Sequence, residues 1–296
     1  MKKKLMLVSV LVGTLFFAGC KQPDINPDED VVVKVEFISQ AVTDYDGNTY
    51  DAVKINNQTW MAENLRSEHY ADGTEIPMGH KPIVDNAGNI TGYQQFEYER
   101  SSFEPYRYMY YGYSNLVPYF GYLYNWPAVM KEAKSSDSNP SGVQGVCPNG
   151  WHVPSDAEWK ELERSLGMDS ATTEKAGFRG RIANKMVASQ SETSFRWTQS
   201  STQGTPGSQD STGRNVSQLS MLPSGKLYDY GVHGFPVVNW VWNSYNWSGE
   251  CAAFWTSTEM MSLRAWYREL NYDKRGVNRG NYYNNDCGYS VRCVKN

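Results

Sequence analysis

Apolar and polar residues alternate along several short stretches of this chain, and a period of two predicts β-strands. The run from Val31 to Ile38 is rich in β-branched residues and predicts a first strand. Residues 50–55 and 58–61 alternate on either side of Asn56-Asn57, which predicts a hairpin. Later strands are expected at 254–258, 265–270 and 289–294.

The clearest helical pattern follows Ser155. This residue can cap a helix, and Glu158 three positions later completes a capping box. Trp159, Leu162 and Leu166 are spaced to share one helical face. A glycine follows directly and supplies a stop signal.

The remaining segments carry weaker signals. Residues 174–186 predict a second helix, and residues 122–130 predict either a strand end or a short helix. Residues 79–120 are rich in Tyr and Gly without a clear period, so we expect loops with short strands. Residues 189–213 are rich in Ser, Thr, Gln and Gly and predict a flexible insertion.

Residues 1–20 have the three parts of a signal peptide. Lys2–Lys4 precede an apolar run, Leu5–Phe17, and the small residues Ala18-Gly19 lead to Cys20. The apolar run of about 13 residues is too short to cross a bilayer core of roughly 30 Å as a helix. Cys20 completes a lipobox and is expected to become the lipidated first residue of the mature chain. The alternative is an ordinary signal peptide followed by a chance cysteine.

The chain after Cys20 divides into a tether and a domain. Residues 21–33 are rich in Pro and Asp and predict a flexible acidic tether. Residues 34–296 are long enough for one large domain, which we expect here. Lys21 directly after the lipid site argues against retention in an inner membrane. We therefore expect a protein that is lipid-anchored in the outer membrane, at the cell surface.

Composition narrows the class of partner. The net charge is −4, and no basic cluster follows the signal peptide, so nucleic acid is not an expected partner. The chain has 21 Tyr and 10 Trp, which is typical of a loop-rich domain held together by aromatic side chains. The expected partners are the membrane, through the lipid, and a glycan or a surface protein.

Four cysteines remain besides Cys20. They are Cys147, Cys251, Cys287 and Cys293. An even number in an oxidising compartment favours two disulfides, and four cysteines allow three connectivities. The chain has no Cys-x-x-Cys pair and no His at zinc-ligand spacing from a cysteine, so no metal site is expected.

Six segments in a fixed order carry a resemblance to a known family. They are Val53–Arg66, Tyr122–Trp126, Cys147–Trp159, Leu222–Gly225, Phe254–Glu259 and Gly288–Val294. Together they resemble the Fibrobacter succinogenes major paralogous domain over roughly residues 45–296. Residues 150–159 and 288–293 also resemble the formylglycine-generating sulfatase-modifying domain, which has a C-type lectin-like fold.

The resemblance implies an α+β fold of the C-type lectin-like type. Such a domain has small twisted antiparallel sheets, about two helices and long loops. It brings its termini together and joins the first helix region to the last strand. The resemblance thereby implies a long-range disulfide between Cys147 and Cys293, with Cys251–Cys287 closing the late loops.

No catalytic residues are expected. The formylglycine-generating relatives use a reactive cysteine pair in a late loop, but Cys293 lies in the terminal strand, where a structural cysteine is expected. Helix capping accounts for the carboxylates Asp156 and Glu158. Neither a Gly-x-Ser-x-Gly nor a His-Glu-x-x-His motif is present. We therefore expect a protein that is not an enzyme and needs no cofactor.

A binding role has the better support from the sequence. Residues 238–250 place aromatic rings among Asn and Ser, which suits stacking on sugar rings and hydrogen bonding to their hydroxyls. The candidate ligand residues are Trp240, Trp242, Asn243, Tyr245, Asn246 and Trp247. The alternative is that these rings fill the core of a loop-rich fold. Asn and Glu side chains here could also hold calcium, but the Trp-Asn-Asp motif of calcium-dependent lectins is absent.

Other tryptophans belong to the family motifs and are expected to be packing residues. They are Trp60, Trp126, Trp151, Trp159 and Trp255. His152 precedes the predicted helix and is expected to be a structural hydrogen-bonding residue.

Overall fold

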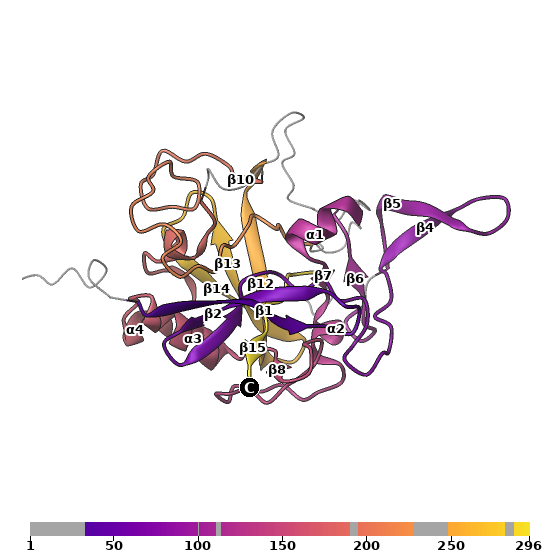
Figure 1. Ribbon diagram of the computed structural model, residues 1–296, viewed down its shortest axis with the longest axis horizontal. Coiled ribbons are helices and arrows are strands. Elements are labelled where there is room, and N and C mark those ends of the chain that lie inside the picture. Colours follow the sequence, from indigo (N-terminus) through magenta and orange to yellow (C-terminus); the bar gives the residue numbers. More distant parts are fainter. Residues whose placement is uncertain (1–32, 100, 111–113, 190–194, 228–247, 282–286) are drawn as a thin grey trace, which may run out of the picture.

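Antiparallel pairing builds two small sheets in the computed structural model, which describes residues 33–99, 101–110, 114–189, 195–227, 248–281 and 287–296 (Figure 1). The first sheet has the strand order β1-β2-β3-β15-β8. These strands span, in that order, Val35–Thr43, Thr49–Ile55, Gln58–Met61, Val294–Lys295 and Trp151–His152. The carboxyl-terminal strand β15 therefore lies between β3 and β8, and the two ends of the domain share one sheet.

The second sheet has the order β12-β13-β14-β9, again antiparallel throughout. Its strands span Cys251–Met261, Arg264–Asn271, Val277–Gly280 and Gly177–Arg179. Three two-stranded pairs complete the described strands: β4-β5, β6-β7 and β10-β11. They span His80–Val84 with Ile90–Tyr98, Arg107–Tyr108 with Leu123–Tyr124, and Arg196–Trp197 with Ser248–Gly249. The mixed fold class with small antiparallel sheets is confirmed.

The described residues contain four α-helices rather than about two, and only one exceeds five residues. They are α1 Val117–Phe120, α2 Trp126–Met130, α3 Asp156–Ser165 and α4 Ser170–Thr173, with 3₁₀ turns η1 Ser114–Leu116 and η2 Ala183–Met186. Among the described residues, none of these helices is long and apolar enough to cross a membrane.

The predicted helix at 174–186 is wrong. Its first part contains β9, which pairs with β14, and its last part is the single turn η2. Gly177 and Gly180 have φ of +83° and +70°, a left-handed backbone that a right-handed helix does not contain. The predicted hairpin, in contrast, is β2-β3, with Asn56 in the left-handed conformation at its turn.

Helix α3 forms as its sequence predicts. Ser155 Oγ accepts a hydrogen bond from the Glu158 N–H, and Glu158 Oε2 accepts one from the Ser155 N–H, which completes the capping box. Trp159, Leu162 and Leu166 are buried in a core with β2, β3 and β12. The glycine at position 167 has φ of +106° and ends the helix.

The motif tryptophans are packing residues, as predicted. Trp60 and Trp159 meet edge to face in one core, with ring centroids 4.8 Å apart. Trp126, Trp151 and Trp255 are buried in the other large core. The Nε1–H of Trp126 and of Trp255 also donates to a backbone carbonyl, so the polar end of each ring is satisfied.

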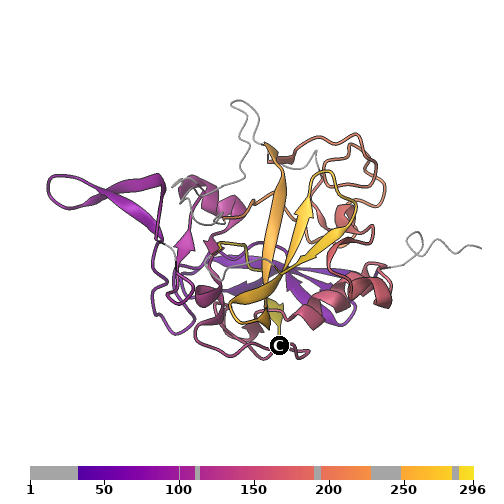
Figure 2. The same ribbon diagram turned by 180° about the vertical axis from the view of Figure 1, so that it is seen from behind.

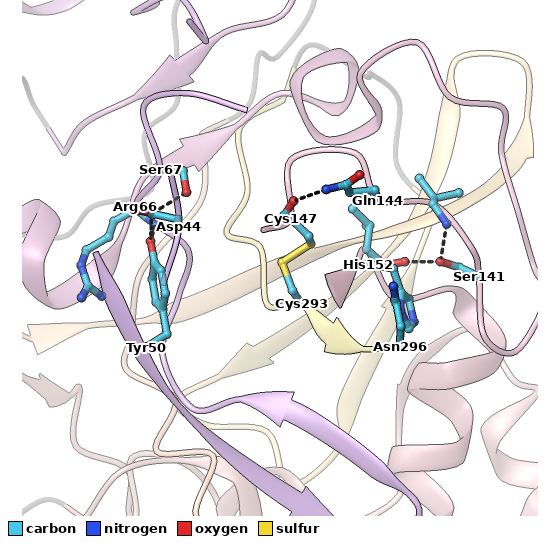
Figure 3. The surroundings of a disulfide bond; sticks show 12 residues. Asp44, Tyr50, Arg66, Ser67, Ser141, Gln144, Cys147, His152, Cys293 and Asn296 are labelled. Carbon is cyan, nitrogen blue, oxygen red and sulfur yellow. Dashed lines mark hydrogen bonds between the residues drawn. A yellow bond between two sulfur atoms is a disulfide. The ribbon is translucent and has the colours of Figure 1, made fainter. Parts of the chain in front are cut away.

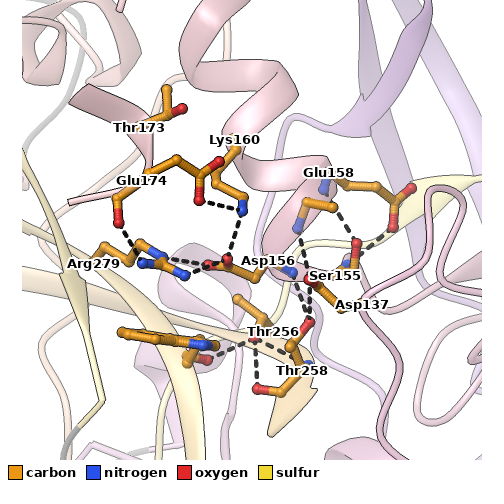
Figure 4. A network of polar contacts seen from close by, with 12 residues as sticks. Asp137, Ser155, Asp156, Glu158, Lys160, Thr173, Glu174, Thr256, Thr258 and Arg279 are labelled. Carbon is orange, nitrogen blue, oxygen red and sulfur yellow. Dashed lines mark hydrogen bonds and ion pairs between the residues drawn. The ribbon is translucent and has the colours of Figure 1, made fainter. Parts of the chain in front are cut away.

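Five buried charged side chains join α3 to the second sheet, and we call them the helix-docking network; Figure 4 shows two of them, Asp156 and Arg279. The five are Asp156, Glu163, Arg179, Arg268 and Arg279. Arg279 donates two hydrogen bonds to the Asp156 carboxylate, from Nε to Oδ1 at 2.9 Å and from Nη2 to Oδ2 at 2.8 Å. Arg268 bridges the two helix carboxylates, with Nη1 2.8 Å from Asp156 and Nε 2.7 Å from Glu163. The Asp156 side chain thus forms ion pairs with the second sheet in addition to lying in the first turn of α3.

The predicted disulfide between Cys147 and Cys293 is present, with the Cα atoms 5.9 Å apart (Figure 3). It closes a chain separation of 146 residues, which in the chain-entropy model contributes roughly 5 kcal/mol. Beside it, His152 bridges Asn296 at 2.6 Å and Glu158 at 2.7 Å. His152 is therefore the structural hydrogen-bonding residue that the sequence predicted.

The second predicted disulfide does not form, and Cys251 and Cys287 are buried thiols. The segment 225–227 lies between them: the Gly225 N–H donates to the Cys251 carbonyl, and Leu227 exchanges two hydrogen bonds with Gly288. An interposed strand places the flanking chains about 9–10 Å apart. A disulfide needs Cα atoms closer than about 7 Å.

The predicted insertion at 189–213 is packed in part of its described length, while residues 201–203 and 211–213 are exposed. Thr205 and Ser208 are buried. Arg214 holds the loop through its guanidinium, which donates to the carbonyls of Ala188, Pro206 and Ser208. Hydrogen bonds from one arginine to three backbone carbonyls therefore hold this segment, which has no apolar periodicity of its own.

Strands β4 and β5 form a ribbon that projects from the body of the domain (Figures 1 and 2). Its base is anchored by His80, which is buried and accepts a hydrogen bond from the Met109 N–H at Nε2. Its outer half exposes Ile83, Val84 and Ile90. The expectation of loops with short strands over 79–120 is confirmed in part: strands are present, but β5 has nine residues, and residues 114–120 form η1 and α1.

Candidate functional site

An exposed aromatic surface lies over a small core at α1, and we define it by Tyr119 and its neighbour Phe195. Tyr119 is 58% exposed, and its ring centroid lies 4.6 Å from that of the half-buried Phe195. The side chain of Phe195 also packs on Phe120 at 4.8 Å. Tyr106 packs against the same core. The exposed ring of Tyr119 therefore packs on other aromatic rings rather than on an aliphatic core.

Local sequence explains why Tyr119 faces outward. Leu116, Val117 and Phe120 are buried, so one turn of helix turns the residue at 119 toward solvent. The helix then stops at Gly121, which has φ of +73°. A Cβ atom there would lie 2.4 Å from the Leu65 carbonyl oxygen.

Buried polar groups hold the foundation of this surface in place. The Asn64 Nδ2–H donates to the Phe120 carbonyl at 2.9 Å, and the Tyr110 hydroxyl donates to the same carbonyl at 3.3 Å. Burial raises the pKa of Tyr110 above its ordinary value, so this phenol stays a neutral donor. The rings above it are consequently on a fixed base.

The predicted ligand residues lie outside the described residues. They are Trp240, Trp242, Asn243, Tyr245, Asn246 and Trp247. The described residues on either side of this segment, however, lie close to the exposed aromatic surface. Leu227 is part of the core beneath Tyr119, and Ser248–Gly249 forms β11, paired with β10 directly after Phe195.

Polar side chains accompany the rings. Ser114 and Asn115 are exposed, and Asn115 is four residues before Tyr119 along the η1–α1 turn, so the two share a face. Arg196 is exposed directly after Phe195. An amide, a hydroxyl and a guanidinium are thus exposed on the segments that carry the two rings, and such groups can hydrogen-bond a ligand.

Sequence reasoning missed Tyr119 and Phe195. Residues 79–120 have many tyrosines but no period, so no single one stood out. Phe195 borders a Ser- and Thr-rich segment that predicted only a flexible insertion. They share no local signal, because Pro118 and Phe120 flank Tyr119 whereas Ser194 and Arg196 flank Phe195.

Cys251, Cys293 and Glu158 are engaged in structure. Burial raises the pKa of the Cys251 thiol to about 12, which keeps it protonated and unreactive near neutral pH. Cys293 is in the disulfide. Glu158 is committed to the capping box and to His152. Within the described ranges, no three metal-binding side chains come together.

These features define a class: a mixed α+β domain with a long-range disulfide, a tryptophan-rich core and an exposed aromatic surface. The family model described as the Fibrobacter succinogenes major domain matches residues 53–295, and the chain belongs to this family. No curated protein and no solved structure matches the chain.

Proposed function

We propose that this protein is a lipoprotein of the outer membrane, lipid-anchored through Cys20, whose domain binds glycans at the cell surface without catalysis. The observation that carries the proposal is the exposed aromatic surface. Leu227 lies in the core beneath it, and β11 pairs with β10, which directly follows Phe195. Sugar rings have apolar C–H faces that suit Tyr119 and Phe195, while Asn115 can bond hydroxyl groups. The acidic tether at 21–33 would hold the domain away from the membrane.

A C-type lectin-like topology is part of this proposal. Its support is the shared sheet of β1 and β15 and the disulfide from the segment before α3 to the segment before β15. The buried thiol of Cys251 argues against chemistry of the formylglycine-generating type.

A glycan array with the purified chain from residue 21 onward tests the binding function, with calcium and with a chelator. Tyr119→Ala should weaken binding roughly tenfold, since a stacked ring contributes about 0.5–1.5 kcal/mol beyond its area. Phe37→Ala removes a ring of similar exposure on β1 and is the matched control. An array without signal under both conditions would refute glycan binding.

The lipid anchor has its own test. Cells fed a labelled fatty acid should label the full-length protein, and Cys20→Ser should remove the label. Surface exposure follows from protease digestion of intact cells.

A structural or assembly role in the cell envelope or a pilus is the second candidate. The projecting β4-β5 ribbon favours it, because Ile83, Val84 and Ile90 are 47–57% exposed. Such an exposed ribbon edge can pair with another chain. Self-association that Ile83→Lys abolishes would favour this role over glycan binding.

A further inference from the structure

A separate pocket of about 320 Å³ opens between the loop at 71–72, the end of α2 and the loop at 142–149. Its polar lining residues are Asp72, Lys131, Gln144 and Asn149, and we call it the ion-pair pocket. Its volume is at the lower end of the range for small-molecule sites. It shares no residue with the exposed aromatic surface.

The walls of this pocket are made of unusual backbone. Lys131 and Glu132 are consecutive non-glycine residues with φ of +46° and +63°. Gly142 and Gly145 opposite them are also left-handed, and a Cβ on Gly145 would lie 2.0 Å from the Val129 carbonyl oxygen. Left-handed non-glycine residues cost conformational free energy and concentrate at functional sites. Here Lys131 ends α2 and lines the pocket, and Glu132 continues the left-handed turn of the chain.

Two opposite charges meet at the pocket. The Lys131 ammonium forms an ion pair with the Asp72 carboxylate, and their side chains are 33% and 56% exposed. The same ammonium lies 4.6 Å from the centroid of the Tyr70 ring. A cation–π contact of this kind keeps the ammonium in place when its carboxylate partner changes.

The other polar groups are uncharged. The Gln144 Nε2–H donates to Asn149 Oδ1 at 3.0 Å, and these amides offer both donors and acceptors at the pocket (Figure 3 shows Gln144 beside Cys147). The remaining lining is small or aliphatic, such as Ala71, Met130 and Val143. No aromatic ring is among the residues lining this pocket, so a sugar finds no stacking face here.

We propose that the ion-pair pocket binds a small zwitterion of the amino-acid class, with its ammonium on Asp72 and its carboxylate on Lys131. A zwitterion satisfies both charges at once, whereas an anion or a cation would leave one of them without a partner. Exposed ion pairs contribute little to stability, so exchanging partners costs the protein little. The amides of Gln144 and Asn149 then contact the remainder of the ligand.

The experiment titrates L-alanine, ethanolamine and acetate into the purified chain from residue 21 onward, with ligand-observed NMR as the readout. L-Alanine should bind at least about tenfold more tightly than either singly charged probe. Equal affinity for the three probes, or no saturable binding of L-alanine, would overturn the proposal.

Variants assign the binding to the pair. Asp72→Asn and Lys131→Gln should each weaken L-alanine binding at least about tenfold. Asp273→Asn and Lys274→Gln alter an exposed ion pair elsewhere and should leave the affinity unchanged. The double exchange Asp72→Lys with Lys131→Asp keeps both charges and should restore binding in the reversed orientation. Wild-type affinity in either single variant, or no recovery in the exchange, would overturn the assignment.

Discussion

The helix-docking network and the ion-pair pocket both join carboxylates to cationic side chains, but they differ in exposure to water. Asp156 and Arg268 have side chains that are 1% exposed, whereas Asp72 and Lys131 are 56% and 33% exposed. Buried charges have lost their hydration and depend on each other. Exposed charges keep theirs and can change partners. We therefore assign the first group to stability and the second to binding.

Breaking the buried network should give the largest effect. Asp156→Asn leaves the Arg279 guanidinium without its carboxylate and removes one of the two carboxylates that hold Arg268. Removing one partner of a buried pair typically costs about 3–5 kcal/mol of the free energy of unfolding. Urea denaturation measures this loss. Asp273→Asn, on an exposed pair, is the control, and an equal effect of the two variants would contradict the comparison.

Removing the disulfide should have a comparable effect. Cys147→Ser with Cys293→Ser releases the constraint on the unfolded chain, and a native disulfide typically contributes about 2–5 kcal/mol. Denaturation of the double variant measures the loss. Reductant should leave the stability of this double variant unchanged, because Cys251 and Cys287 form no disulfide. If reductant destabilised the Cys147/Cys293 double variant further, a second disulfide would be present.

The two thiols give a chemical test of the same point. In the folded chain from residue 21 onward, Cys251 and Cys287 are buried and should not react with iodoacetamide. After unfolding without reductant, mass spectrometry should find both cysteines alkylated. Alkylation of neither would mean that they had formed the disulfide predicted from the sequence.

The contrast between these cysteine pairs shows what the sequence could specify. Capping boxes and hairpin turns are local, so α3 and β2-β3 could be predicted from neighbouring residues. The pairing of Cys147 with Cys293 came with a motif resemblance. The fate of Cys251 and Cys287 depended on segment 225–227, which inserts between them and carries no local signal of doing so.

The candidate sites were harder to predict for the same reason. Asp72 and Lys131 are 59 residues apart, and no spacing rule links them. The left-handed backbone at Lys131 and Glu132 could not be predicted, because neither residue is a glycine. Tyr119 is exposed only because its three buried neighbours on the turn dictate its direction. Such sites are products of the assembled fold.

A smaller effect should appear as a pH dependence of stability at His152. Burial opposes protonation of this imidazole, but the hydrogen bond and charge of Glu158, with help from Asn296, raise the pKa of His152 above its ordinary value. The stabilising contribution is therefore complete below about pH 6.5 and is lost as the pH rises through the folded-state pKa.

Denaturation of the wild type and His152→Gln between acidic and mildly basic pH measures this contribution. The stability difference between the two proteins should shrink as the pH rises. Glu158→Gln removes the charge that raises the pKa and should flatten the dependence, besides weakening the helix cap by about 1 kcal/mol. A difference that grows with pH would mean that His152 is held neutral.

The smallest effect on stability is expected at the ion-pair pocket, where the effect on binding should be large. Asp72→Asn and Lys131→Gln remove charges that remain hydrated, so their unfolding curves should overlay that of the wild type. The same variants should lose L-alanine binding. Asp156→Asn should show the opposite result. Its free energy of unfolding should fall, while its folded fraction should still bind L-alanine. If Asp72→Asn unfolded as readily as Asp156→Asn, the exposed pair would be a structural one, and the distinction between the two groups of charges would not hold.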